Sequence, residues 1–246
     1  MSKIFAHRGF SGEYPENTML AFRKAVEAGS DGIELDVHLS QDGEIIVMHD
    51  EKIDRTTDGS GYIREYTAEE LRRFDAGAAW KGRFPFEPIP TLREYFQLVK
   101  DSPLVTNIEL KNSIFWYEGM EEKVIALIRE FGLEDRIIFS SFNHESIAKC
   151  RRLAPEIPGG FLYDCWIIDS GSYAAANGVQ YLHPSFHDIN EEIVRKVHSQ
   201  GVGFNVWTVN DEDVMRRLAQ LEVHGIITNY PDKCRGVLNS LRGGAG

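Results

Sequence analysis

The chain has 246 residues, of which 42% are hydrophobic, 26% charged and 11% aromatic, an ordinary globular composition. Its 38 acidic and 27 basic residues give a formal charge of −11, so we expect no nucleic-acid partner and no stable membrane association, although a small anionic substrate is compatible with this charge. No apolar run approaches the ~18 residues of a membrane-spanning helix, so no such helix is predicted.

Three cysteines, Cys150, Cys165 and Cys234, are odd in number and widely spaced, which predicts neither a disulfide framework nor a metal-binding pair. The first predicted strand follows Met1 almost directly, so we expect no signal peptide ahead of the fold. Both features favour a reducing, cytoplasmic location. The sequence indicates no particular oligomeric state.

The first predicted elements, in chain order, are a strand, a helix and a β-hairpin, at residues 4–6, 18–28, 32–39 and 45–48. Asp42-Gly43 lies between the last two apolar runs, and this dipeptide is a strong hairpin signal.

Residues 50–90 break the pattern with repeated glycines and prolines, and within them only 67–74 looks helical. We interpret this stretch as a small inserted lobe. Regular structure resumes with a helix from Thr91, its expected N-cap, to about Lys100.

From residue 105 onward, short apolar runs alternate with amphipathic stretches. Apart from the hairpin's return strand, eight parallel strands are predicted, beginning near residues 4, 32, 105, 137, 160, 181, 204 and 225. The later helices are predicted near 118–131, 144–153, 166–177, 190–200, 211–221 and 232–240.

Eight strand–helix units predict an α/β protein with a (β/α)8 TIM barrel, a hairpin at the barrel mouth and a small insertion. An open doubly wound sheet is the alternative, but no glycine-rich nucleotide-binding motif follows the first strand. We expect a single domain over residues 1–241, with the lobe at about 50–90 and a disordered tail at 242–246.

Functional side chains of such barrels lie at the carboxyl ends of the strands. Glu34 and Asp36 leave one face of the second strand, and Glu109 ends the third. Three clustered carboxylates repel one another unless a cation lies among them, and as hard oxygen ligands they suit Mg²⁺ or Ca²⁺. The alternative is an ion-pair cluster with Arg8 and Lys111.

His7 ends the first strand, and His49 returns to the mouth at the end of the hairpin. Two imidazoles beside one cation suggest a general acid and a general base. Arg8 and Lys111 are suited to binding a phosphate. His38 shares the inward parity and could line the pocket, although a structural role is favoured.

Two aromatic residues, Phe142 and Trp207, follow or end strands, and each is either a pocket wall or ordinary core. The remaining histidines are expected to be polar surface or loop residues: His144, His183, His187, His198 and His224.

Seven segments, in this order and spacing, resemble the glycerophosphodiester phosphodiesterase family in its bacterial, cytoplasmic form. They cover nearly the whole chain and are His7-Arg8-Gly9, Pro15-Glu16-Asn17-Thr18, Glu34-Leu35-Asp36-Val37, Asp42-Gly43, Val47-Met48-His49-Asp50, Ile108-Glu109-Leu110-Lys111 and Val206-Trp207-Thr208-Val209-Asn210.

The resemblance implies a (β/α)8 barrel that hydrolyses a glycerophosphodiester to glycerol 3-phosphate and an alcohol. It implies one divalent cation, Ca²⁺ or Mg²⁺, on Glu34, Asp36 and Glu109. It makes His7 and His49 the acid/base pair. Phosphate contacts would come from Arg8 and Lys111, and Glu16 would lie at the edge of the site.

Several alternatives stay open. Attack by a glycerol hydroxyl through a cyclic phosphate competes with direct attack by water. A related phosphodiesterase of lysophospholipids would need an apolar entrance, and a glycerophosphodiester-binding barrel without catalysis would need no histidine pair. Residues that could form the apolar entrance, or simply the lobe's own core, are Phe74, Trp80, Phe84, Phe86, Ile114, Phe115, Trp116 and Tyr117.

Overall fold

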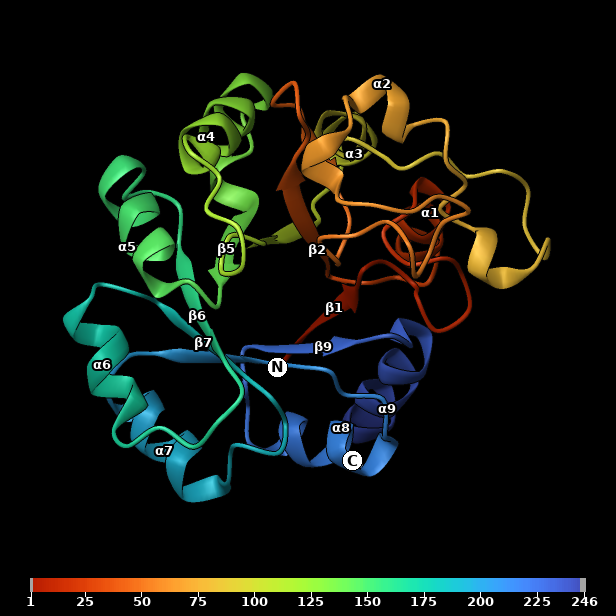
Figure 1. Ribbon diagram of the computed structural model, residues 1–246. Helices are drawn as coiled ribbons and strands as arrows, with labels where there is room; N and C mark the ends of the chain where they lie inside the picture. Colours follow the sequence, from red (N-terminus) through yellow and green to blue (C-terminus); the bar gives the residue numbers. More distant parts are fainter. Residues whose placement is uncertain (1, 244–246) are drawn as a thin grey trace.

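The computed structural model describes residues 2–243, and its centre is a ring of eight parallel strands (Figure 1). The ring closes because β1 (Lys3–His7) pairs with β2 (Gly32–Leu39) on one side and with β9 (Gly225–Thr228) on the other. Between β2 and β9 follow β4 (Val105–Leu110), β5 (Ile137–Ser141), β6 (Gly159–Tyr163), β7 (Tyr181–Pro184) and β8 (Gly203–Val206). The predicted (β/α)8 barrel is confirmed, and the open sheet is excluded.

Helices surround the ring, as Figure 1 shows. They are α1 (Met19–Glu27), α3 (Leu92–Val99), α4 (Met120–Phe131), α5 (His144–Leu153), α6 (Ser170–Ala176), α7 (Glu191–Ser199), α8 (Glu212–Gln220) and α9 (Pro231–Gly243). Thr18 and Thr91 cap α1 and α3 by accepting backbone N–H groups with their hydroxyls. In residues 2–243, no helix is both long and apolar enough to span a membrane.

The end of the chain differs in part from expectation. Helix α9 continues through Arg242 and Gly243, which the sequence places in a disordered tail. Leu241, just past the predicted end at residue 240, packs on the main apolar core, and this contact favours continuation of the helix. The rest of the predicted tail, 244–246, lies outside the described residues.

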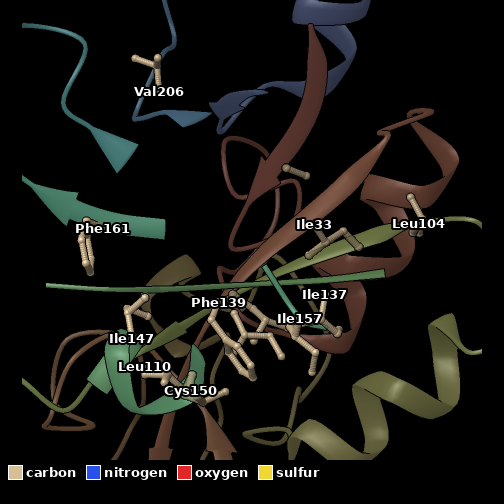
Figure 2. Packing of buried hydrophobic residues seen from close by; sticks show 14 of the residues in the cluster. Ile33, Leu104, Leu110, Ile137, Phe139, Ile147, Cys150, Ile157, Phe161 and Val206 are labelled. Carbon is tan, nitrogen blue, oxygen red and sulfur yellow. The ribbon is translucent and has the colours of Figure 1, made fainter. Parts of the chain in front are cut away.

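Side chains alternate between two environments along each strand. Ile108 and Leu110 of β4 face the helices and join the main apolar core. Phe139 of β5 and Phe161 of β6 belong to the same core, and Figure 2 shows them with Leu110. The intervening positions point into the barrel, where branched apolar residues usually fill the space. Here many of these inward side chains are buried and polar: Glu34, Asn107, Glu109, Ser140, His183 and Asn205.

The hairpin leaves the ring at β2, whose outer half pairs antiparallel with β3 (Ile45–Val47). Residues 48–90 then form an irregular segment with two short 3₁₀ turns (Ile63–Glu65, Ala78–Trp80) and α2 (Ala68–Leu71). This helix is shorter than the predicted 67–74. A second apolar cluster lies under the segment, formed by Ile46, Met48, Ile53, Ile63, Leu71, Ala76 and Ile89.

Candidate active site

A pocket opens at the carboxyl ends of the strands, with an empty volume of about 420 Å³ including its open mouth. Its lining includes seven residues predicted from the sequence, namely His7, Arg8, Glu34, His49, Glu109, Phe142 and Trp207. The others are Asn107, Ser140, Leu162, His183, Thr208 and Ile227. The predicted residues Asp36, Lys111 and Glu16 do not line this pocket but contact residues that do.

Three carboxylates meet on the β2–β4 side. The strand register places Asp36 opposite Glu109, and one oxygen from each of Glu34, Asp36 and Glu109 lies within 4.8 Å of the other two. Burial, together with repulsion from the other two carboxylates, raises the pKa of Glu34 well above its ordinary value. Burial also raises the pKa of Glu109. This cluster could hold a divalent cation.

Two cations partly neutralise the cluster. The Nζ of Lys111 lies 2.8 Å from Glu109 Oε1 and 3.8 Å from Asp36 Oδ1, and the Nε of Arg8 lies 3.5 Å from Asp36 Oδ2. Burial would raise the pKa of Asp36, but Arg8 and Lys111 together lower it. Glu34 lacks such a pairing among the described residues: its Oε2 accepts the backbone N–H of Arg8. Asp36 and Glu109 therefore have a lysine or arginine partner, whereas Glu34 has none in the part of the chain that the structure describes.

The backbone at Arg8 has an unusual conformation, with φ at 57°. The next residue, Gly9, has φ at 80°, and a Cβ there would lie 2.8 Å from the backbone of Ala21. Only glycine fits this close approach to α1. The turn directs Arg8 back toward the carboxylates, where its Nη1 donates to Glu16 Oε1 at 2.9 Å. Arg55 of the inserted segment holds Glu16 from the other side.

The two predicted catalytic histidines are supported differently. His7 Nδ1 lies 2.7 Å from the amide oxygen of Asn229, so this nitrogen carries the proton and Nε2 is a free acceptor. Burial, assisted by Arg8, lowers the pKa of His7 to about 3. His49 Nδ1 lies 2.6 Å from the carboxylate of Asp50, which Arg55 also holds. In both residues Nε2 is the ring nitrogen left for the pocket.

Of two other histidines, His183 lines the pocket and His38 does not. His38 is fully buried and does not line the pocket; its ring contacts the Tyr117 hydroxyl and the His49 carbonyl, so it supports the backbone of His49. His183 is predicted at the surface, and this is wrong: it is fully buried in the barrel and lines the pocket. The strand that carries it is short, and parity alone could have placed the side chain inward.

The aromatic residues form one wall. Phe142 and Trp207 meet edge to face, with ring centroids 5.8 Å apart. Trp207 Nε1 donates to the His183 carbonyl at 2.7 Å, which fixes the indole and leaves its ring for the pocket. Both residues are therefore pocket wall.

Some residues of the site were missed by sequence reasoning. Asn229 follows β9 directly, so applying the strand-end rule to that strand could have found it. Asp50 is adjacent to His49 in a matched segment. Asn17, which donates to Asp36 Oδ2 at 2.9 Å, also lies in a matched segment. Arg55 carries no such signal, because tertiary folding alone brings it here.

Comparisons with known proteins agree with this geometry. The sequence profile of the "Glycerophosphoryl diester phosphodiesterase family" matches residues 7–233. A glycerophosphodiester phosphodiesterase of Caldanaerobacter subterraneus subsp. tengcongensis is 42% identical, covering 98% of each chain. One from Bacillus altitudinis is 43% identical, covering 98% of this chain and all of that one.

Solved structures give the same answer. A phosphodiesterase of Oleispira antarctica, determined in complex with the product sn-glycerol-3-phosphate, is 30% identical with a TM-score of 0.87, and 97% of each chain is covered. A putative glycerophosphoryl diester phosphodiesterase of Silicibacter pomeroyi has a TM-score of 0.89 at 27% identity, covering 98% of this chain and 94% of that one. The chain therefore belongs to the glycerophosphoryl diester phosphodiesterase family, and its activity is the hydrolysis of glycerophosphodiesters.

Proposed function

We propose that the enzyme hydrolyses water-soluble glycerophosphodiesters to glycerol 3-phosphate and an alcohol, with one divalent cation and with His7 and His49 as the acid/base pair. The observation that carries this proposal is the convergence of both imidazoles and of Glu34 and Glu109 on one pocket. A relative's complex with sn-glycerol-3-phosphate supports the product.

The donor set fits Mg²⁺ or Ca²⁺. Glu34, Asp36 and Glu109 offer oxygen atoms only, and Asp36 Oδ1 is buried without a hydrogen-bond donor in residues 2–243. Burial and repulsion from Asp36 and Glu109 raise the pKa of Glu34, and a cation bound beside these carboxylates would offset that repulsion. A cation bound there would lower the pKa of a coordinated hydroxyl or water and would stabilise charge on the phosphate.

Two side chains are placed to hold the phosphate. Arg8 lines the pocket, and its Nη1 is fixed by Glu16. Lys111 is held at the edge by Glu109 and Asp36. A guanidinium gives paired donors and an ammonium a point charge, so together they orient a phosphodiester between the histidines.

The histidines then move the protons. One Nε2 takes the proton of the attacking oxygen, and the other donates a proton to the departing alkoxide. Asn229 hydrogen-bonds Nδ1 of His7, and Asp50 hydrogen-bonds Nδ1 of His49. In each ring this leaves Nε2 for proton transfer. If a glycerol hydroxyl attacks first, a cyclic phosphate forms and water opens it with the two roles exchanged. Substrate lacking that hydroxyl separates the routes, because unimpaired turnover would exclude the cyclic one.

The testing experiment is glycerol 3-phosphate release from glycerophosphocholine in Mg²⁺, in Ca²⁺ and in EDTA. We expect release that depends on metal, and this names the working ion. Full activity in EDTA after metal stripping would contradict the metal role. No release in any condition would contradict the substrate assignment.

Exposed apolar side chains at the mouth favour one second candidate, cleavage of lysophospholipids. Ile114 and Trp116 on the β4–α4 loop are 69% and 62% exposed, whereas Tyr117 is buried. In the inserted segment, Phe74 packs on that segment's own core and Phe84 packs on Tyr14 and Trp80. Lysophosphatidylcholine is therefore run as a parallel substrate, with choline and lysophosphatidic acid as the measured products because its acyl chain stays on the glycerol. Turnover of this substrate alone would favour the second candidate.

A further inference from the structure

A chain of buried and half-buried polar groups, which the proposed chemistry does not use, begins at the floor of the pocket. It runs from His183 on β7 through Asn205 on β8 to His224 and Tyr181 at the amino-terminal end of the barrel. His183 and Asn205 are 0% and 1% exposed. A polar chain in a barrel interior needs a reason, because each unpaired polar atom there destabilises the fold.

Two inward-facing glycines make room for this chain. A Cβ on Gly160 would lie 2.2 Å from His183 Nε2, and one on Gly225 would lie 2.3 Å from Asn205 Oδ1. The register pairs His183 with Leu162, so Gly160 lies one inward position deeper. The Nε2 edge of the imidazole therefore dips into the space that Gly160 leaves. Nδ1 lies on the other side of the ring from this edge, and His183 is one of the residues that line the pocket.

In this series of polar groups, each residue donates a hydrogen bond to the next one toward the pocket. Asn205 Oδ1 can only accept, so His224 carries its proton on Nδ1 and donates it to that oxygen at 2.7 Å. His224 Nε2 is then left to accept from the Tyr181 hydroxyl, 3.4 Å away. Asn205 Nδ2 then donates to His183 Nε2 at 3.1 Å. Burial lowers the pKa of His183 to about 3, so the ring is neutral and its one proton is on Nδ1.

This Nδ1–H has no partner in residues 2–243. Asn107, another buried residue of the pocket lining, donates a hydrogen bond from its amide nitrogen to Ser140. Its amide oxygen, Oδ1, likewise has no partner in residues 2–243. The floor thus presents one unpaired donor and one unpaired acceptor. An alcohol hydroxyl can accept from the first and donate to the second.

We propose that His183 is a specificity-determining residue whose Nδ1–H, with the acceptor Asn107 Oδ1, binds a free hydroxyl of the substrate's glycerol. Asn205 and His224 act through His183 by fixing which of its nitrogens carries the proton. A site that hydrogen-bonds a hydroxyl discriminates against analogues that lack it, because its buried groups then stay unpaired. The inference deepens the proposed function, on which it rests for the identity of the substrate.

Two variants test the roles of the two ring nitrogens of His183 separately. His183→Asn keeps an amide nitrogen near the position of Nδ1, whereas His183→Gln keeps an oxygen near Nε2 to accept from Asn205 and loses the pocket donor. The matched control is His198→Gln, the same change at an exposed position of α7.

The measurement is calorimetric binding of glycerol 3-phosphate and of propyl phosphate, which has the same chain without hydroxyls, at saturating Mg²⁺. We expect His183→Gln to weaken binding of glycerol 3-phosphate about tenfold, the loss of one buried hydrogen bond, with propyl phosphate unchanged. His183→Asn and His198→Gln should bind both ligands as the wild type does. Equal weakening of both ligands in His183→Gln, or of neither, would overturn the proposal.

A second measurement does not depend on the variants folding. In wild-type enzyme labelled with ¹⁵N-histidine, the His183 ring should show a proton on Nδ1 at neutral pH, and that signal should shift with glycerol 3-phosphate but not with propyl phosphate. A proton on Nε2 would overturn the assignment. Failure of the proposed function is recognised separately, because the wild type would then release no glycerol 3-phosphate from glycerophosphocholine.

Discussion

The two sides of the pocket belong to one ring of strands but carry different chemistry. On the β1–β2–β4 side several inward residues are ionisable and lie close together: His7 Nε2 is 3.9 Å from Glu34 Oε2, and Glu34 shares the carboxylate cluster with Glu109. On the β5–β9 side the lining is uncharged, with Leu162 and Trp207 as examples. Charged groups in a dry site can move protons and stabilise developing charge. Uncharged groups can recognise shape and hydroxyls, so reaction and recognition should be separable by mutation.

The largest effect is expected from the charged side. His49→Ala and His7→Ala should each lower kcat by about 10²–10⁴ with a much smaller change in KM, because the lost groups transfer protons in the transition state. Steady-state kinetics on glycerophosphocholine measure this. The exposed His198→Gln variant is the control and should keep wild-type kinetics. Near-normal turnover of either alanine variant would remove that histidine from the acid/base pair.

A smaller effect, on thermal stability, is expected when the charge of Glu34 on the ionisable side of the pocket is removed. Burial and carboxylate neighbours raise the folded-state pKa of Glu34 above its ordinary 4.5. Its ionisation therefore costs stability above the folded-state pKa, and this cost disappears as the pH falls toward 4.5. In EDTA at neutral pH, Glu34→Gln should raise Tm by about 2–4 °C for each 1 kcal/mol relieved.

Thermal melts from pH 5 to 8 check the sign. The gain of Glu34→Gln over the wild type should shrink as the pH falls, and added Mg²⁺ or Ca²⁺ should stabilise the wild type more than the variant. Glu118→Gln, an exposed change on the β4–α4 loop, should leave both curves unchanged. A destabilised Glu34→Gln protein in EDTA would mean that the carboxylate cluster is already balanced by Arg8 and Lys111.

Much of the fold could be predicted because the barrel repeats one local pattern. Apolar strands that alternate with capped helices specify each unit by themselves, and Thr91 capping α3 is an example. The strand-end rule likewise brings His7, Glu34 and Glu109 together, since the carboxyl ends of parallel strands meet at one mouth.

The rest depends on contacts that no local pattern encodes. Arg55 comes from an irregular segment, and only the folded lobe places it between Glu16 and Asp50. His183 lies on a four-residue strand, where parity gives the direction of the side chain but not whether the barrel has room for a buried imidazole. Its inward place is permitted by Gly160 on the neighbouring strand, a pairing that sequence separation conceals.

The smallest effect is expected from the uncharged side. Phe142 is 40% exposed and contacts Trp207 edge to face. An aromatic pair contributes about 0.5–1.5 kcal/mol beyond its buried area, so Phe142→Ala should raise KM for glycerophosphocholine by about two- to tenfold. Because a phenyl ring neither transfers a proton nor carries charge, kcat should stay within about twofold of wild type.

Phe86→Ala is the matched control, since it removes a phenyl ring that is 56% exposed on the inserted segment. It should leave both constants for glycerophosphocholine unchanged. A large fall in kcat for Phe142→Ala would show that the uncharged wall helps to position the reacting phosphate, and reaction and recognition could then no longer be assigned to opposite sides of the pocket. A rise in KM alone would leave the division intact, because the wall would then act before the chemical step and not during it.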